Sequence, residues 1–206
     1  MNKILRLIFV LCICNIFSSC DQNYSFELSV SEFQEELNKA FSDSVKSPLA
    51  EEERATFDGL PFYPANPDLR VEARYKRIAG KVVEIPTTTG RKARYQPYGL
   101  LNFDLKGKPF ELTVFRTVAF PSNQVEEKKV PLFLPFTDLT NGDGTYGGGR
   151  YIDIEEQEGS KWVLDFNQAY NPYCAYNDKY SCPIPPKENH LEFRIEAGVK
   201  YDVTDY

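Results

Sequence analysis

The stretch Thr145-Tyr-Gly-Gly-Gly-Arg-Tyr-Ile-Asp-Ile154, followed by Lys161-Trp-Val-Leu-Asp-Phe166, decides the fold of this 206-residue chain. In both segments apolar side chains recur at every second position, which is typical of a strand with one buried face. This alternation puts Trp162, the single tryptophan, on the apolar face of its strand. The polar, glycine-containing link 155–160 indicates a turn, so we predict that the two segments form an antiparallel hairpin.

Working outward from this stretch, the same period of two continues through most of the chain. The further strands that it predicts cover residues 71–79, 81–86, 91–95, 98–105, 109–120 and 191–197. About eight short strands with glycine-containing turns favour a closed antiparallel barrel or a sandwich. We therefore expect a mainly β (α+β) fold.

Two helices are expected before the strands. Ser31-Glu-Phe-Gln34 has the form of a capping box, and apolar residues at helical spacing follow it as far as about Ser42. Ser47-Pro48 has the form of a second helix start, which we extend to about Thr56. The two helices would cover one end or one edge of the sheet and protect unpaired strands there.

The first 20 residues have the pattern of a targeting segment. Lys3 and Arg6 precede an apolar run from Leu7 to Phe17, which is too short for a stable membrane span. Phe17-Ser-Ser-Cys20 then resembles a bacterial lipobox, in which cleavage exposes a lipidated cysteine. We predict a signal peptide over residues 1–19, a polar tether over 20–30 and one β-rich domain over 31–206. An ordinary signal peptide and a tethering helix are the alternatives.

This leader places the protein in the cell envelope, outside the cytoplasm, with the lipid on Cys20 attached to a membrane. Cys12 and Cys14 would leave with the leader, so Cys174 and Cys182 form an even pair in an oxidising compartment. We predict a disulfide between them. Two free buried thiols or a metal pair are the other interpretations, and no metal is expected because too few further ligands are available.

Composition limits the possible partners. The chain has a net charge of −6, and loss of the leader makes it more negative, so nucleic acid is not expected as a partner. The motifs typical of serine hydrolases, zinc proteases and phosphate-binding loops are absent from the sequence. No cofactor is therefore expected.

Arg150 is the residue on which the predicted ligand site depends. It lies on an otherwise apolar strand face, where a guanidinium needs either a carboxylate partner or the anion of a ligand. Glycines, amides and phenols of the same region would frame a pocket with it. The residues of this predicted site are Arg150, Tyr146, Gly148, Asn167, Asn171 and Tyr176.

Two classes of function follow from these residues. In the first, the protein binds a small molecule, a glycan or an envelope protein, with Arg150 as an anion anchor. In the second, it is a hydrolase of an envelope substrate, with acid/base chemistry from Asp138, Asp165 or His190. The sequence shows no convergent acid/base pair, so binding is the favoured function and no catalytic residue is assigned.

Several blocks resemble the signatures of a bacterial and archaeal family, domain of unknown function 1684. The blocks are Ser47-Pro-Leu49, Phe57-Asp-Gly-Leu-Pro-Phe-Tyr-Pro64, Leu132-Phe-Leu-Pro-Phe-Thr-Asp138, Thr145-Tyr-Gly-Gly-Gly-Arg-Tyr151, Leu164-Asp-Phe-Asn-Gln-Ala-Tyr-Asn-Pro-Tyr-Cys-Ala-Tyr176 and Ser181-Cys-Pro-Ile-Pro-Pro-Lys-Glu-Asn189. The resemblance extends from about Phe33 to Lys200. It implies no activity, because the family brings no assigned catalytic residues.

Overall fold

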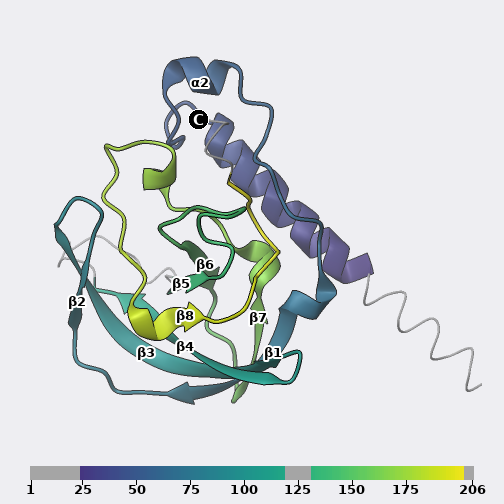
Figure 1. Ribbon diagram of the computed structural model, residues 1–206, viewed down its shortest axis with the longest axis vertical. Coiled ribbons are helices and arrows are strands. Elements are labelled where there is room, and N and C mark those ends of the chain that lie inside the picture. The colour runs from purple at the N-terminus through teal and green to yellow at the C-terminus, as the bar shows by residue number, and fades with distance from the viewer. Residues whose placement is uncertain (1–23, 119–130, 202–206) are drawn as a thin grey trace, which may run out of the picture.

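The computed structural model describes residues 24–118 and 131–201. Their centre is one strongly curled sheet of eight strands (Figure 1). The strands are β1 (Arg70–Arg77), β2 (Val83–Pro86), β3 (Lys92–Leu105), β4 (Lys108–Thr117), β5 (Leu132–Asp138), β6 (Arg150–Ile154), β7 (Lys161–Asp165) and β8 (His190–Leu191).

The sheet is an open half-barrel. Its main path is β6-β5-β4-β3-β1-β7, with β2 paired to β3 and β8 to β5, and every pair is antiparallel except β5–β8. The mainly β class is thus confirmed. Neither a closed barrel nor a sandwich is seen in residues 24–118 and 131–201, where the edge strands β6 and β7 form no ladder with each other.

The predicted hairpin of β6 and β7 is therefore wrong, although its side-chain alternation is right. Ile152 and Trp162 are buried, but β6 pairs with β5 and β7 pairs with β1. In the link between them, the Gln157 side chain donates to the carbonyl of Val163 at 2.9 Å and accepts from its N–H at 2.8 Å. This side chain pairs the backbone N–H and carbonyl of Val163 on the free edge of β7. In the predicted hairpin, β6 would have paired with this edge.

The main core fills the inside of the curl. Its fully buried side chains come from nearly every strand and from the C-terminal segment: Leu101, Leu112, Leu132, Leu134, Phe136, Ile152, Trp162, Leu164, Phe166 and Leu191 among them. Tyr75 stacks on the Trp162 indole at 3.8 Å between ring centroids. Each of the large side chains contributes about 1.5–3 kcal/mol by leaving water, so this core is the principal source of stability.

Two predicted strand boundaries change in the structure. The strands expected at 91–95 and 98–105 are one strand, β3, with a register shift between Pro97 and Gly99. The strand expected over 191–197 is limited to β8. The carbonyls of Ile195 and Ala197 accept hydrogen bonds from a buried arginine, described below, so that stretch does not continue the ladder.

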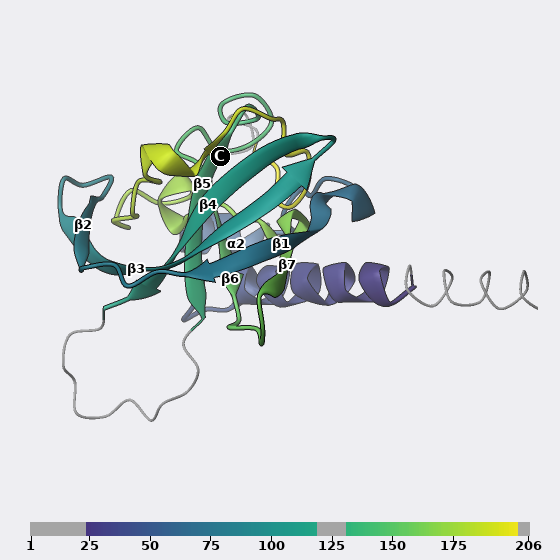
Figure 2. The ribbon, with the colours of Figure 1, turned by 90° about the horizontal axis from the view of Figure 1, so that it is seen from below.

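A long helix over residues 24–42 precedes the sheet. It is longer than the predicted helix at 31–42, and residues 24–30 are not a polar tether, because Phe26 and Val30 are buried. Figures 1 and 2 show the helix alongside β6 and β7. The Arg70 guanidinium at the start of β1 donates to the Ser29 hydroxyl at 3.1 Å, which ties the helix to the sheet.

The other helical elements are short. They are α2 (Glu51–Ala55) and the 3-10 turns η1 (Pro67–Leu69), η2 (Phe166–Gln168), η3 (Tyr173–Ala175) and η4 (Lys187–Asn189). The N-cap of α2 is Ala50 rather than the expected Ser47, and the Glu53 carboxylate accepts from the Ala50 N–H at 2.8 Å. The Ser47 hydroxyl accepts instead from the N–H of Leu49.

The predicted signal peptide and Cys20 lie outside the described residues. Within the described part of the chain, no helix has both the length and the apolar character needed to cross a membrane.

Candidate functional site

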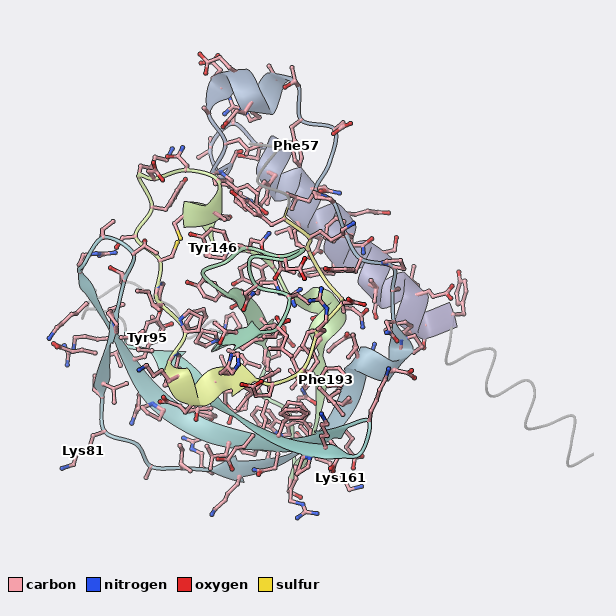
Figure 3. All side chains as sticks on the ribbon, viewed as in Figure 1. Phe57, Lys81, Tyr95, Tyr146, Lys161 and Phe193 are labelled. Carbon is pink, nitrogen blue, oxygen red and sulfur yellow. The ribbon has the colours of Figure 1, made fainter. Side chains whose placement is uncertain are left out.

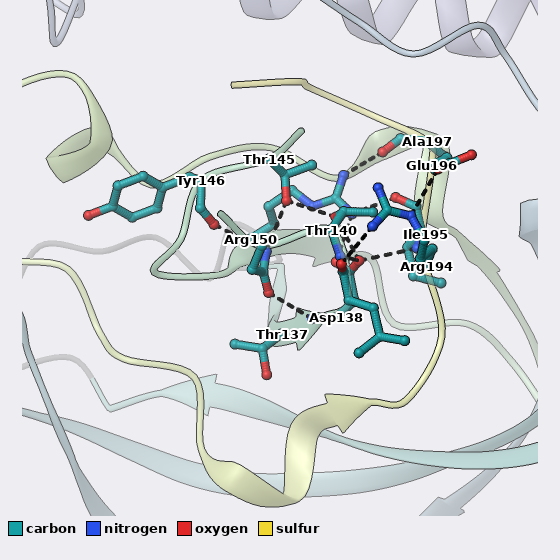
Figure 4. Close-up of polar contacts among 12 residues, drawn as sticks. Thr137, Asp138, Thr140, Thr145, Tyr146, Arg150, Arg194, Ile195, Glu196 and Ala197 are labelled. Atoms are coloured by element: carbon teal, nitrogen blue, oxygen red, sulfur yellow. Dashed lines mark hydrogen bonds and ion pairs between the residues drawn. The ribbon is translucent and has the colours of Figure 1, made fainter. Parts of the chain in front are cut away.

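Arg150 is fully buried and paired with Asp138 (Figure 4). Its NH2 group donates to the Asp138 carboxylate at 2.9 Å and to the Ile195 carbonyl at 2.7 Å, and its NH1 group donates to the Ala197 carbonyl. The other carboxylate oxygen of Asp138 accepts from the N–H of Thr140 at 2.8 Å. The guanidinium and the carboxylate thus hold the C-terminal segment against the sheet.

Gly149 allows this arrangement. Its φ of +91° lies in the left-handed region, and a Cβ there would lie 2.7 Å from the Phe136 carbonyl oxygen. Only glycine accepts both the backbone conformation and the close approach. The glycine turn therefore allows the backbone to pack closely against Phe136 within the protein. This packing places the next residue, Arg150, in the core.

The structure contradicts the proposed role of Arg150 as an anion anchor. Its side chain is 0% exposed, and burial lowers its pKa against the opposing effect of Asp138. A ligand anion would have to displace Asp138 and reach a sealed site. The internal ion pair, one of the two partners that the sequence indicated for Arg150, is what the structure contains.

The other residues of the predicted site have internal contacts as well. Tyr146 packs edge-on against Tyr201, and Gly148 lies so close to the Tyr146 ring that a Cβ would meet it at 2.4 Å. The Asn171 amide donates to the Tyr176 hydroxyl and to the Lys200 carbonyl, both at 3.1 Å.

Asn167, the remaining residue of the predicted site, also forms its hydrogen bonds within the protein. Its amide donates to the Asn66 carbonyl at 2.9 Å and accepts from the Asn66 N–H at 2.8 Å, which fastens the loop before β1. None of the six predicted residues lines the cavity described next.

A cavity of about 430 Å³, which we call the tyrosine pocket, lies on the other face of β5 and β6. Figure 3 shows Tyr95, from this side of the sheet, well apart from Phe193, which packs against the main core. The residues that line the pocket are Phe33, Leu37, Tyr95, Phe133, Tyr151, Asp153, Tyr170, Pro172, Tyr173, Tyr180, Ser181, Cys182 and Pro183.

Three parts of the chain build the pocket. The sheet contributes one wall, because Phe133 of β5 and Tyr151 of β6 point away from the main core and pack edge to face at 4.7 Å. The loop over residues 170–183 forms the second wall, and the helix over 24–42 contributes the third. The Tyr151 hydroxyl donates to the Pro183 carbonyl and fixes the loop on the sheet.

Asp153 is the one charged side chain that the described residues contribute to the pocket lining. It accepts a hydrogen bond from the Tyr170 hydroxyl at 3.0 Å. The residue as a whole is exposed, but the surrounding rings remove enough water from the carboxylate to raise its pKa, against the lowering effect of the Tyr170 hydrogen bond. A carboxylate in this position can accept a hydrogen bond or receive a positive charge from a ligand.

The phenols around Asp153 remain neutral in the physiological pH range. Burial raises the pKa values of Tyr95, Tyr170 and Tyr173, and the negative charge of Asp153 raises them further. The pocket therefore offers neutral rings, phenolic hydroxyls and a single acidic group.

Cys174 and Cys182 lie side by side at the edge of the pocket as free thiols. The N–H of Cys174 donates to the Cys182 sulfur at 3.1 Å. A hydrogen bond from the Cys182 thiol lowers the pKa of Cys174 to about 7, whereas the pKa of Cys182 is raised. The structure thus brings together the two residues of the predicted disulfide, and the bond itself stays a prediction.

The candidate acid/base residues of a hydrolase do not converge. Asp138 is sealed against Arg150, and Asp165 is 7% exposed and lies 3.5 Å from the Arg70 guanidinium. His190 is on β8, where its Nδ1 lies 2.9 Å from the Thr137 hydroxyl. The geometry gives these three residues no shared site.

The sequence contained one signal for the tyrosine pocket. Leu132-Phe-Leu-Pro-Phe136 is apolar at every position, a pattern typical of a strand covered on both faces. Asp153 lies between the buried Ile152 and Ile154 and points to the opposite face of β6, as a period of two predicts, but its cover by the loop and the helix depends on long-range packing. Tyr170, Tyr173 and Tyr180 come from a segment without a regular period, so the sequence does not show where their rings lie.

Comparison with known proteins gives a family and a structural relative. The family model "Protein of unknown function (DUF1684)" matches residues 55–200. The solution NMR structure of an uncharacterized protein of Haloarcula marismortui is 37% identical and has a TM-score of 0.70, with 89% of this chain and 98% of that chain covered. A comparison with curated proteins found no match. The chain belongs to the DUF1684 family of proteins of unknown function.

Proposed function

We propose that the protein is a cell-envelope lipoprotein that binds a small, ring-containing molecule in the tyrosine pocket. The lipid anchor at Cys20 and the envelope location rest on the leader sequence. The binding function rests on the pocket, where seven aromatic side chains surround one carboxylate acceptor. Its volume of about 430 Å³ falls in the range of small-molecule sites, which is roughly 300–1,000 Å³.

The shape of the site narrows the kind of ligand. A cavity with rings on several walls fits one flat or ring-shaped group, either an apolar ring or a single sugar, better than a protein surface, which needs a broad contact. Asp153 would orient the bound molecule by accepting a hydrogen bond from it. Asp138, Asp165 and His190, the candidate acid/base residues of a hydrolase, are not among the described residues that line this pocket. The pocket therefore does not support the hydrolase function.

Binding can be tested on the mature chain with N-phenyl-1-naphthylamine, a neutral aromatic probe whose fluorescence rises in apolar sites. We expect saturable binding at one site per chain. Leu37→Trp places a larger side chain in the pocket and should weaken binding at least about tenfold, or about 1.4 kcal/mol.

Leu28→Trp is the matched control, because Leu28 is on the same helix but is 46% exposed and does not line the pocket. It should leave probe binding unchanged. Equal binding by the wild type and Leu37→Trp, with melting curves that show both are folded, would refute the pocket as the binding site.

A further inference from the structure

The charge of the tyrosine pocket is unbalanced. Among residues 24–118 and 131–201, its lining contains one carboxylate, Asp153, and no lysine, arginine or histidine. In the described parts of the chain Asp153 forms no ion pair within 4 Å, and its hydrogen-bond partner is the neutral Tyr170 hydroxyl. By contrast, Asp138 and Asp165 each have an arginine within that distance. The pocket therefore holds a negative group for which the described residues supply no counter-charge.

The walls around Asp153 suit a positive group. Aromatic ring faces attract cations, and an ammonium that leaves water for such a site gains most when several rings surround it. Seven aromatic side chains line the cavity: Phe33, Tyr95, Phe133, Tyr151, Tyr170, Tyr173 and Tyr180. An anionic ligand would instead meet the Asp153 carboxylate, and a neutral ligand would leave its charge uncompensated.

We propose that the ligand of the tyrosine pocket is an organic cation, with an ammonium group against Asp153 and an apolar or ring-containing part against the aromatic side chains. This inference rests on the proposed binding function and adds the chemical class of the ligand. A sugar in the same pocket is the competing outcome.

The pH dependence of binding follows from the direction of the Asp153 pKa. Burial raises this pKa above its ordinary value of 3.8, so a cation, which favours the ionised carboxylate, should bind more tightly as pH rises through it. The facing phenols of Tyr95, Tyr170 and Tyr173 have raised pKa values, as does the thiol of Cys182.

The two side chains from the helix, Phe33 and Leu37, do not titrate. Cys174, next to Cys182, has a pKa of about 7 and sets the upper limit for a clean measurement. Below the pKa of Cys174, Asp153 is therefore the group of the described pocket lining that can change charge.

The test compares probes that share a ring but differ in charge. Benzylamine, a cation at these pH values, and benzyl alcohol are titrated by NMR or calorimetry into the mature chain, together with methyl α-glucoside. We expect benzylamine to bind at least tenfold more tightly than the other two, and its affinity to fall as the pH is lowered toward 4.

Asp153→Asn separates the charge from the shape, since the amide oxygen can still accept from the Tyr170 hydroxyl. The variant should lose the preference for benzylamine and its pH dependence, while its melting temperature stays unchanged. Asp104→Asn, an exposed carboxylate on β3, is the matched control and should behave as the wild type.

The outcomes distinguish the two proposals. Equal affinity for benzylamine and benzyl alcohol, a preference that survives Asp153→Asn, or tighter binding of the glucoside would overturn the cation proposal and leave the binding pocket intact. Binding of all three probes that is insensitive to Leu37→Trp would overturn both.

Discussion

At the scale of the residue, Arg150 shows what a sequence can say about a buried charge. Its place on an apolar strand face indicated that it needs a partner, and that inference was sound. Local pattern could not select Asp138 as that partner, because the contact requires the curl of β5 and β6 and the turn at Gly149. Because this long-range contact cannot be read from the sequence, Arg150 was incorrectly assigned as an anion anchor.

Arg150→Ala should destabilise the fold by about 3–5 kcal/mol, because it leaves the Asp138 carboxylate buried without its counter-charge. Urea unfolding of the mature chain measures the change. The matched control is Arg194→Ala, which removes an exposed ion pair with Asp143 and should cost less than about 1 kcal/mol. Equal free energies of unfolding for the two variants would show that the buried ion pair does not stabilise the fold more than the exposed one.

The cysteine pair gives a second prediction at this scale. In the reduced protein, the pKa of about 7 at Cys174 means that its reactive thiolate forms as pH rises through that value. The rate of alkylation by iodoacetamide should therefore rise to half its plateau near pH 7. With Cys174→Ser, alkylation in this range should be slower, because burial still raises the pKa of Cys182 when its hydrogen bond with the Cys174 thiol is gone.

Oxidation of the same pair tests the predicted disulfide. Mature protein recovered from an oxidising compartment, then unfolded without reductant, should show no reactive thiol from Cys174 or Cys182. Two reactive thiols per chain would show that the hydrogen-bonded pair remains reduced.

At the scale of the element, β4 and β5 are joined less by their ladder than by a side chain. The register between them is limited to Phe115 and Phe133. The Asn189 amide accepts from the N–H of Thr113 at 2.8 Å and donates to the carbonyls of Thr113 and Pro135 at 2.8 and 2.7 Å. It bridges two strands where the chain cannot continue a regular ladder.

Asn189→Ala should therefore cost about 2–4 kcal/mol, since it leaves buried backbone groups of both strands without partners. Amide hydrogen exchange at Thr113 should accelerate in the same variant. Asn102→Ala, on the exposed side of β3, is the control and should change stability by less than about 0.5 kcal/mol. Retained protection at Thr113 would contradict the bridging role.

The elements also show where pattern is sufficient. Alternation located most strands and identified their buried faces correctly, because burial of one face imposes a period of two on the side chains. It could not state which strands pair. β6 and β7 follow each other in sequence but lie at opposite edges of the sheet, because their partners, β5 and β1, come from distant parts of the chain.

At the scale of the whole molecule, the tyrosine pocket exists because three distant segments meet on one face of the half-barrel. The helix over 24–42, β5 and β6, and the loop over 170–183 each showed apolar or aromatic residues beyond the needs of a single core. The sequence shows these residues, but it does not show that the three segments lie next to one another in the folded protein. The candidate site was therefore assigned to the glycine turn, where the unusual residues cluster.

The proposed membrane anchor also belongs to this scale. Cys20→Ser should prevent lipid attachment, so the protein should move from the detergent phase to the aqueous phase in a Triton X-114 partition of cells that express the full chain. Metabolic labelling with a palmitate analogue should be lost in parallel. Labelling of the variant equal to that of the wild type would contradict lipidation at Cys20.

The central claim is that ligands enter the tyrosine pocket and not the Arg150 region. The most direct measurement is NMR mapping of bound benzylamine on the isotope-labelled mature chain. We expect the largest shifts at Asp153, Tyr95 and Tyr173, with Arg150 and Ala197 unaffected. Shifts centred on Arg150 and Ala197, with the pocket unchanged, would contradict it.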